Sequence, residues 1–598
     1  MVLAGQTGAP HGARLPFSEI WMVDFEFVAN PGECPIPVCM VAEEYFTGRQ
    51  LRLWADELKL LDAAPFNTGM DACFVAYYAS AEFGCFLALG WPLPENTIDL
   101  FAEHRVITNG LSLVHGNSLL GAARRFGIPT IGAGEKETMR ELIMSGGPWS
   151  TDDRGAILDY CASDVTLLRP LLAAMLPEVT RQPARLGQAV WRGRYMGAVA
   201  VMEHNGVPID VKTLQAILAN WSGIQDRLIA EVDQDYGVYD GRTFKADRFA
   251  AYLRSHNIPW PRLGTGHLKL DDDTFRTMAR AFPQVSALRE LRHALGELRL
   301  NNLSVGTDGR NRTLLSPFRS KTGRNQPSNS RAIFGTAVWL RGLIKPQPGS
   351  ALAYLDFSSQ EFAIAAHLSG DSKMQRAYAS GDPYLQFAKD AGLAPSNATK
   401  RSHEAVRDRC KAIVLGVQYG MSAVGMAQRA GIPEAEARSL LQLHREHYRT
   451  FWAWAEANVL SALAGATLST PMGWQFRQGY GTAANDRSLL NWPMQSTGAD
   501  ILRLSCVRLM KTGVKICVPV HDAILIEAPL ELIDDHVEVA RSIMEQACRD
   551  LLNGAACRVD AEIVRYPDRY MDEKRGVAMW NTVMRSIGLT EYKAEPAP

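Results

Sequence analysis

Residues 355–362 read Leu-Asp-Phe-Ser-Ser-Gln-Glu-Phe and place Asp356 at the end of an apolar stretch that begins at Ala351. A second aspartate, Asp522, follows the apolar stretch 516–520 and one histidine. These apolar runs predict two strands that carry the carboxylates, so each carboxylate would lie in apolar surroundings. A buried charge is costly unless a metal ion or an ion pair compensates it. Two such aspartates predict a site for hard cations, which bind carboxylate oxygens.

A helix is predicted between the two aspartates, over residues 407–420. Arg407, Lys411, Leu415 and Tyr419 recur every four positions and therefore form one stripe on that helix. The stripe begins with cationic side chains, which suit phosphates, and ends with apolar and aromatic ones, which suit a flat base. An amphipathic surface helix with a basic edge would show the same spacing. The two aspartates favour the functional interpretation.

These segments, in this order, resemble the family A DNA polymerases, the family that includes bacterial DNA polymerase one and many bacteriophage replicases. Residues 356–361 are similar to the family's D-Y-S-Q-I-E, residues 407–420 to R-x3-K-x3-F-G-x2-Y-G, and residues 521–522 to the H-D of the last motif. Residues 202–210 resemble the segment that precedes the thumb. The remaining matched positions, similar to R-x3-N-x3-Q, are Arg487, Asn491 and Gln495. The resemblance runs from about residue 185 to 528.

The resemblance implies a role for each matched residue. Asp356 and Asp522 would bind two Mg²⁺ ions per site, with Mn²⁺ as an alternative, for transfer of a deoxynucleotide to a primer 3′ end. Glu361 would occupy the space of a ribose 2′-hydroxyl. The residues expected to bind the incoming nucleotide are Glu361, Tyr384, Arg407, Lys411, Leu415 and Tyr419. The residues expected to contact DNA are Arg324, Arg341, Arg487, Asn491, Gln495 and His521.

Several positions depart from the family pattern, among them Pro519 in place of a Gln and the three that follow. Ala523 stands where the family has Glu after H-D, and we expect activity to survive on two aspartates. Leu415 replaces an aromatic residue that normally meets the incoming sugar and base, which should alter discrimination against sugar analogues. Tyr384 stands where a triphosphate-contacting His is usual. These departures favour a divergent, phage-type replicative polymerase.

A second set of carboxylates lies in the first 175 residues, where short apolar strands alternate with helical stretches. Strand 21–28 and amphipathic helix 113–125 are examples, and the alternation predicts a compact α/β domain. Asp24-Phe25-Glu26 and Tyr160-x3-Asp164 resemble the D-x-E and Y-x3-D motifs of ribonuclease H-like 3′→5′ proofreading exonucleases.

The middle exonuclease motif is usually N-x3-D, and here Tyr78-x3-Glu82 stands in its place. The resemblance implies that Asp24, Glu26 and Asp164 bind metal ions, that Tyr160 orients the attacking water and that Glu82 completes the site. Asp99 is a second candidate for this last position. The alternative is a degenerate exonuclease fold kept for packing and DNA guidance.

We therefore expect an α/β and α+β multidomain chain, with a ribonuclease H-like exonuclease domain followed by a right-hand polymerase. Residues 1–175 would form the first and 176–598 the second. Within the polymerase we expect the thumb at about 211–305, the palm at about 306–370 and 480–598, and the fingers at about 371–479. We expect no 5′-nuclease domain ahead of them, since the first exonuclease motif comes close to residue 1.

The composition fits an ordinary globular protein, with 47% hydrophobic and 21% charged residues. The ten cysteines form no CxxC pair, which indicates reduced thiols in a cytoplasmic protein. The resemblance implies that the cell is bacterial and the protein phage-encoded. Neither a signal peptide nor a membrane span is evident. The net charge is −1, but eleven Lys and Arg face three acidic residues between positions 289 and 345. We expect these cations to form a basic stripe that contacts phosphates.

The predicted partners are primer-template DNA, deoxynucleoside triphosphates and a processivity factor or other replisome proteins. A single-subunit RNA polymerase is an alternative with a similar palm, but Glu361 would obstruct a ribonucleotide. A DNA-binding scaffold that has lost catalysis is another. The joint presence of Asp356, Asp522, Arg407 and Lys411 argues against the scaffold.

Overall fold

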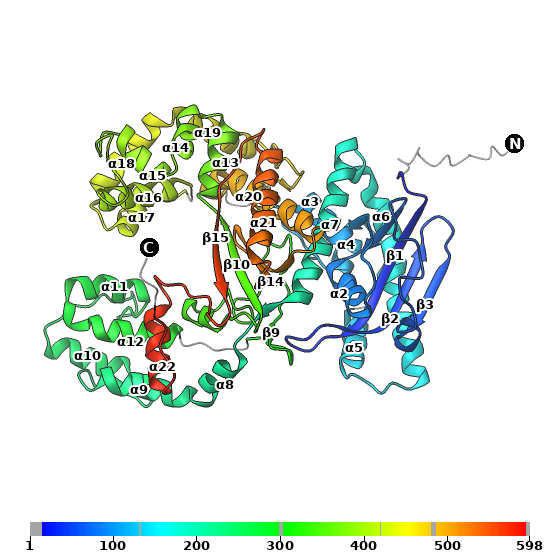
Figure 1. The fold of residues 1–598 in the computed structure, drawn as a ribbon, viewed down its shortest axis with the longest axis horizontal. Coiled ribbons are helices and arrows are strands. Elements are labelled where there is room, and N and C mark those ends of the chain that lie inside the picture. The colour runs from blue at the N-terminus through cyan, green and yellow to red at the C-terminus, as the bar shows by residue number, and fades with distance from the viewer. Residues whose placement is uncertain (1–14, 131–132, 298–302, 419, 480–485, 594–598) are drawn as a thin grey trace. The chain divides into compact units, whose positions relative to one another are not determined.

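The computed structural model describes residues 15–130, 133–297, 303–418, 420–479 and 486–593, which Figure 1 shows as a ribbon. The chain divides into two compact units. The larger unit comprises residues 1–205, 315–326 and 353–563. The smaller unit comprises residues 206–314, 327–352 and 564–598. The division therefore does not follow the order of the sequence, and it passes through two strands of one sheet.

The N-terminal part of the larger unit, here called the N-terminal α/β region (residues 15–205), contains a five-stranded sheet in the order β3-β2-β1-β4-β5. β1 pairs antiparallel with β2 and parallel with β4. The strands are β1 (Glu19–Val28), β2 (Ile36–Glu44), β3 (Gln50–Trp54), β4 (Ala72–Ala76) and β5 (Thr97–Asp99). The predicted strand over residues 21–28 thus lies inside β1.

The helices of the N-terminal α/β region lie beside this sheet, in the blue to cyan part of Figure 1. They are α1 (Ala55–Leu58), α2 (Ser80–Leu89), α3 (Leu100–Thr108), α4 (Leu119–Arg125), α5 (Ala133–Met144), α6 (Thr151–Val179) and α7 (Pro183–Asn205). The predicted boundary at residue 175 falls within α6. The predicted start of a helix at residue 113 is wrong, because Gly116 has φ +70° and the Ser118 side chain caps α4.

A second sheet in the larger unit has the order β13-β14-β10-β15. Its strands are β10 (Ser350–Phe357), β13 (Lys515–Val520), β14 (Ala523–Pro529) and β15 (Val559–Arg565). The helices α13 (Gln360–Ser369), α20 (Asp486–Met510) and α21 (Ile533–Leu551) accompany it. The prediction that Asp356 lies on an apolar strand is confirmed. The same prediction for Asp522 is wrong, because β13 ends at Val520, His521 takes φ +56°, and Asp522 lies in the turn before β14.

The chain between α13 and α20 is mainly helical, as expected. Its helices are α14 (Ser372–Ala379), α15 (Pro383–Asp390), α16 (Glu404–Gln418), α17 (Ala423–Ala430), α18 (Glu434–His447) and α19 (Arg449–Leu463). A short hairpin, β11 (Leu468–Ser469) and β12 (Gln475–Phe476), follows α19.

The smaller unit is also mainly helical, around a core that includes Phe249, Phe275 and Leu288. Its helices are α8 (Val211–Ala219), α9 (Trp221–Asp233), α10 (Ala246–Ser255), α11 (Asp272–Ala281), η1 (Pro283–Val285), α12 (Ser286–Glu297), η2 (Val338–Leu343) and α22 (Val577–Ser586). Two short pairs of strands interrupt the helical pattern: β6 (Val207–Pro208) with β9 (Arg310–Asn311), and β7 (Tyr239–Asp240) with β8 (Thr243–Phe244).

Gly206 and the cysteines are found as the sequence predicts. α7 ends at Asn205, and Gly206 follows it with φ +59°, which confirms this glycine as the stop signal. All ten cysteines are free thiols. Among the described residues, no helix combines the length and the apolar character that a membrane span requires.

Candidate active sites

Asp356 and Asp522 are brought together by the second sheet. β14 lies between β13 and β10, so the turn that carries Asp522 comes beside the end of β10 that carries Asp356. Burial raises the pKa of Asp356 to about 7, with help from the negative charges of Asp522 and Asp560. Burial also raises the pKa of Asp522, against the positive charge of Arg324. Two carboxylates that disfavour each other's ionisation are arranged as a cation site requires.

Asp560 is a third carboxylate beside this pair, and none of the sequence motifs includes it. β15 neighbours β10 in the sheet, and Ser358 N donates to Arg558 O at 2.9 Å. The Ser358 hydroxyl donates to the Asp560 carboxylate. The available signal was the alternation of apolar and polar residues in Val559-Asp560-Ala561-Glu562, which predicts a strand. Ala523, where the resemblance led us to expect Glu, is fully buried at the start of β14.

Glu361 and Arg324 form an ion pair next to the aspartates. Glu361 lies in the first turn of α13, and Arg324 Nη2 is 3.2 Å from its Oε1. Burial raises the pKa of Glu361, whereas the Arg324 charge opposes that rise. The same guanidinium also lowers the pKa of Asp522, so Arg324 faces both carboxylates. The other Glu361 oxygen, Oε2, is buried without a hydrogen-bond partner among the described residues.

The predicted stripe on α16 lies on its accessible side. Lys411 is exposed and Arg407 and Leu415 are partly buried, whereas Ile413, Val414 and Val417 on the other side are buried. The predicted stripe therefore lies on the more accessible face of the helix. Tyr419, the last residue of the predicted stripe, lies outside the described residues.

Tyr384 lies beside Arg407 and Lys411, two of the cations of α16. Its ring centroid is 5.6 Å from the Arg407 guanidinium carbon and 5.7 Å from Lys411 Nζ. Its hydroxyl accepts a hydrogen bond of 3.2 Å from Ser359 Oγ, two residues before Glu361. Arg407 also forms an ion pair with Asp382. The structure thus connects α15, α16 and the start of α13 around a cationic surface.

Arg487, Asn491 and Gln495 are spaced by four residues on α20 and so share one face. Asn491 is buried, and its Oδ1 has no hydrogen-bond partner among the described residues. Gly420 has φ +60°, and a Cβ there would lie 2.7 Å from the Arg487 Cβ. The C-terminal end of α16 therefore packs against the start of α20, and only glycine fits at this contact.

Arg341 belongs to a different unit from the other predicted DNA contacts. It lies in η2 of the smaller unit, with its guanidinium 3.6 Å from Asp572 and 5.5 Å from the Phe334 ring centroid. His521, by contrast, directly precedes Asp522 in the turn between β13 and β14.

The N-terminal α/β region gathers the second set of carboxylates. Asp24 and Glu26 lie on β1, Glu82 on α2 and Asp164 on α6. Phe25 N donates to Glu82 Oε2 at 2.7 Å, which fixes Glu82 against the strand that carries Asp24. Burial raises the pKa of Asp24, and the charges of Glu26 and Asp164 add to the rise. Burial likewise raises the pKa of Glu26 to about 9.

Lys136 on α5 is the cation of this second cluster, and no motif pointed to it. Its Nζ lies 2.5 Å from Asp164 Oδ2 and 5.5 Å from the Tyr160 ring centroid. Its positive charge opposes the rise in the pKa of both Asp24 and Glu26 that burial causes. Asp99 has a structural role instead. Its carboxylate caps α3 by accepting a hydrogen bond from Ala102 N at 2.6 Å, and it also accepts one from Ala79 N at 2.5 Å.

The donor atoms of both clusters are carboxylate oxygens, which suit Mg²⁺ or Mn²⁺. Among the described residues, no three His, Cys, Asp or Glu side chains are grouped so as to hold a metal ion by themselves. Asp356 and Asp522 could each supply carboxylate oxygens to such an ion. In the N-terminal cluster an ion would compete with Lys136 for Asp164.

The comparison with protein families matches residues 324–563 to the model described as DNA polymerase family A. This range begins at Arg324 and includes Asp356, Glu361, Lys411 and Asp522. Residues 324–563 form a family A DNA polymerase domain. The carboxylates of the N-terminal α/β region lie outside this match.

Several curated relatives of the polymerase domain are called DNA polymerase I. The thermostable enzyme of Thermus thermophilus is 28% identical over 381 residues, which cover 58% of this chain and 44% of that enzyme. The enzyme of Aquifex aeolicus is 25% identical over 463 residues, covering 69% of this chain and 77% of the relative. The match thus spans less than half of the Thermus enzyme.

A solved structure described as the POL domain of Pol1 from M. smegmatis, in complex with DNA primer-template and dNTP, has the same fold. The TM-score is 0.70 at 18% sequence identity, and the match covers 93% of this chain and 96% of that chain. The mixed α/β polymerase fold therefore extends beyond the residues that the family model matches.

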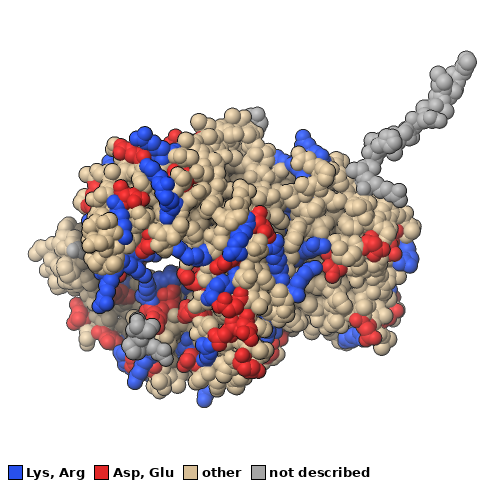
Figure 2. All heavy atoms as spheres, turned by 45° about the horizontal axis from the view of Figure 1, so that its top comes forward, with Lys and Arg blue, Asp and Glu red and all other residues tan. Residues whose placement is uncertain are grey.

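Two of the cations between Arg289 and Lys345 make contacts inside the smaller unit. Residues 315–326 belong to the larger unit, which holds the polymerase domain, and the others to the smaller unit. Arg292 stacks 4.2 Å from the Phe244 ring centroid, and Arg310 is buried and donates to Gly206 O at 3.0 Å. In Figure 2, Lys and Arg are interspersed with Asp and Glu over the face shown. Arg292 and Arg310 thus serve internal contacts, and the basic stripe stays a prediction; Arg299 lies outside the described residues.

Glu203 on α7 is a partly buried carboxylate outside both clusters, and it predicts a pH-dependent stability. It accepts a hydrogen bond from Leu315 N at 2.6 Å, and burial raises its pKa to about 8. An unfolded Glu loses its proton near pH 4.5, so the folded protein holds an extra proton between the two values. Its contribution to stability is complete below pH 4.5 and is lost as the pH rises through about 8.

We expect Glu203→Gln to remove this dependence, because Gln stays neutral and its oxygen still accepts from Leu315 N. The free energy of unfolding of the variant should rise relative to wild type by up to about 1.4 kcal/mol per pH unit across this window. Urea unfolding at pH 5 and pH 8 measures the difference, with Glu178→Gln as a control at an ion pair whose side chains are 41% (Glu178) and 21% (Arg185) exposed. Equal differences at the two pH values would show that Glu203 is ionised in the folded protein.

Proposed function

We propose that the chain is a template-directed DNA polymerase that adds deoxynucleotides to a primer 3′ end. The observation that carries this proposal is the convergence of Asp356, Asp522, Arg324 and Glu361 within a family A polymerase domain, with a cationic helix face nearby. In the right-hand description, the second sheet corresponds to the palm, α14–α19 to the fingers and α8–α12 to the thumb.

Asp356 and Asp522 would hold two Mg²⁺ ions that activate the primer 3′-hydroxyl and neutralise the leaving pyrophosphate. Arg407 and Lys411 would bind the triphosphate, since both lie on the accessible side of α16. Tyr384 stacks against both cations and holds them at the phosphates. Glu361 would exclude a ribose 2′-hydroxyl, and its ion pair with Arg324 fixes it in that position. A ribonucleotide would therefore be disfavoured.

The DNA would be primer-template, by analogy with the M. smegmatis structure, which holds a DNA primer-template and a dNTP. Asn491 is suited to a DNA or nucleotide contact because its buried Oδ1 has no partner among the described residues. Arg487, Gln495 and His521 would contact the same DNA, as would Arg341 from the smaller unit. A replicative role in a bacteriophage is consistent with the departures at Leu415 and Ala523.

The N-terminal α/β region would supply 3′→5′ proofreading through a ribonuclease H-like site. The support is that Asp24, Glu26, Glu82 and Asp164 converge from three elements, with Tyr160 beside them. The observation that favours an inactive site instead is the ion pair between Lys136 and Asp164. In that case the region would guide DNA and support the polymerase domain without hydrolysis.

Primer extension with matched and mismatched 3′ ends tests both activities, using wild type and Glu82→Gln. Gln keeps the hydrogen bond from Phe25 N but removes the charge beside Asp24. We expect matched extension at the wild-type rate and mismatch removal slowed by about 10²-fold. Wild-type extension without mismatch removal would mean that the N-terminal region has no nuclease activity. No extension by wild type would favour the DNA-binding scaffold.

A further inference from the structure

The loop of residues 315–326, here called the Arg324 loop, is held by side chains of the N-terminal α/β region. Arg105 on α3 donates to Phe318 O and to Arg319 O, each at 3.2 Å. Asn109, which caps the same helix, donates to Lys321 O at 2.7 Å. These carbonyls belong to no helix or strand, so side chains satisfy them.

The Lys321 carbonyl is the centre of the attachment. It accepts from Asn109 Nδ2 at 2.7 Å, from Trp492 Nε1 at 2.9 Å and from Trp474 Nε1 at 3.1 Å. Asn109 is fully buried, and its Nδ2 also donates to Gln475 O at 2.7 Å. One amide therefore joins the Arg324 loop to β12.

The turn at Gly323, within the same loop, is also tightly packed. Gly323 has φ +76°, and a Cβ there would lie 3.1 Å from the Trp474 ring. Its carbonyl accepts from Arg503 at 2.7 Å, and Gly323 N donates to Ser320 O at 3.0 Å. This turn leads from the Lys321 carbonyl to Arg324, three residues further along the same packed loop.

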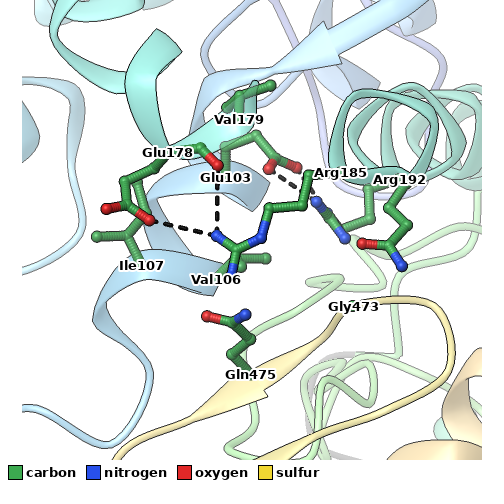
Figure 3. A pocket seen from close by; sticks show the side chains of 10 residues that line it. Glu103, Val106, Ile107, Glu178, Val179, Arg185, Arg192, Gly473 and Gln475 are labelled. Atoms are coloured by element: carbon green, nitrogen blue, oxygen red, sulfur yellow. Dashed lines mark hydrogen bonds and ion pairs between the residues drawn. The ribbon is translucent and has the colours of Figure 1, made fainter. Parts of the chain in front are cut away.

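α3 is itself clamped by a buried ion pair, shown in Figure 3. Arg192 of α7 binds Glu103 of α3 through two hydrogen bonds of 2.6 and 2.8 Å, and it also donates to Met472 O at 3.0 Å. Arg477 donates to Ile107 O at 2.7 Å. Both residues of the pair line a small pocket that the side chain of Gln475 also faces. Together these contacts make α3, the Arg324 loop and the hairpin β11–β12 one packed assembly.

We propose that Asn109 and Arg105 are positioning residues of the polymerase site, which act through Arg324. Arg324 lies 3.2 Å from Glu361 and faces Asp522, so its placement sets the charge around both carboxylates. The N-terminal α/β region is then part of the machinery that selects and places the nucleotide, whether or not it hydrolyses DNA. The catalytic consequence rests on the proposed function, whereas the support of the loop does not.

Asn109→Ala in the full chain tests the proposal, with Asn96→Ala as the matched control. Asn96 is also a buried asparagine of the N-terminal α/β region, and its Nδ2 donates to Met70 O at 2.9 Å and Ala72 O at 3.2 Å, both within that region. The first readout is trypsin cleavage after Arg319, Lys321 and Arg324, mapped by mass spectrometry. We expect about 10-fold faster cleavage in Asn109→Ala, because the loop opens more often, and no change in Asn96→Ala.

The second readout is single-nucleotide incorporation in a double-mutant cycle. We expect Asn109→Ala to lower kcat/KM by about 10-fold in the wild-type background and to have no effect in the Arg324→Ala background. Fully additive effects, or wild-type trypsin cleavage, would overturn the proposal. Arg105→Lys, which keeps the charge but loses the paired hydrogen bonds, serves if Asn109→Ala does not fold. If wild type extends no primer, the proposed function fails, and the trypsin readout still decides whether α3 supports the loop.

Discussion

Asp522→Asn is expected to slow nucleotide incorporation by at least about 10³-fold. Asn has the size of Asp but lacks the charge that a metal ion requires. The neighbouring Asp356 should respond as well, because the Asp522 charge contributes to raising its pKa to about 7. Without that charge the pKa of Asp356 should fall. Asp356 would then ionise more readily, but it would be the only carboxylate left of the pair. Single-turnover incorporation at saturating Mg²⁺ measures the loss.

The control for this variant is Glu531→Gln, which removes an exposed carboxylate just after β14. Mismatch removal provides a second control, because the carboxylates proposed for it lie on β1, α2 and α6. An incorporation rate of Asp522→Asn within tenfold of the wild-type rate would show that the polymerase site does not depend on Asp522. Equal loss of both activities would point to misfolding, which circular dichroism detects.

Glu103→Ala is expected to destabilise the chain by about 3–5 kcal/mol, because it leaves the Arg192 charge buried and unpaired. Arg192 is 7% exposed and Glu103 is 3% exposed, so water cannot replace the lost partner. Removing both charges in Glu103→Ala/Arg192→Ala should cost less than the sum of the two single changes. Urea unfolding followed by tryptophan fluorescence measures these free energies.

The matched control is Arg52→Ala, which breaks an ion pair of similar length, 2.5 Å, between side chains that are 37% and 73% exposed. Because solvent screens this pair, the expected loss is below about 1 kcal/mol. A loss of similar size for the two variants would show that burial does not strengthen the Glu103–Arg192 pair. Faster trypsin cleavage in the Arg324 loop should accompany Glu103→Ala, since the ion pair holds α3.

Local patterns in the sequence were sufficient for several elements of the polymerase domain. The apolar run before Asp356 forms β10, the stripe from Arg407 to Leu415 lies on the accessible side of α16, and Gly206 follows the end of α7. Each of these depends on neighbours within a few residues, and helix and strand periodicities report such neighbours directly. The predicted roles of the site residues stay predictions.

Other predictions failed because contacts between residues far apart in the sequence decide where a side chain lies. Asp522 lies in a turn because the chain reverses after Val520 to pair β13 with β14. Arg292 and Arg310 looked like surface cations, but they stack on an aromatic ring and bond to a distant carbonyl. Charge counted along the sequence cannot show which side of a helix or loop will be covered by another element.

The sequence by itself determined that this chain carries a family A polymerase pattern, because spaced side chains on single helices and strands encode it. Only the tertiary structure decided that Asp560 joins Asp356, that Lys136 meets Asp164, and that Asn109 holds the Arg324 loop. The partners in these three pairs are separated by 204, 28 and 212 residues, as their numbers show. No local periodicity reports contacts of this kind, because they form only when packed elements bring remote segments together.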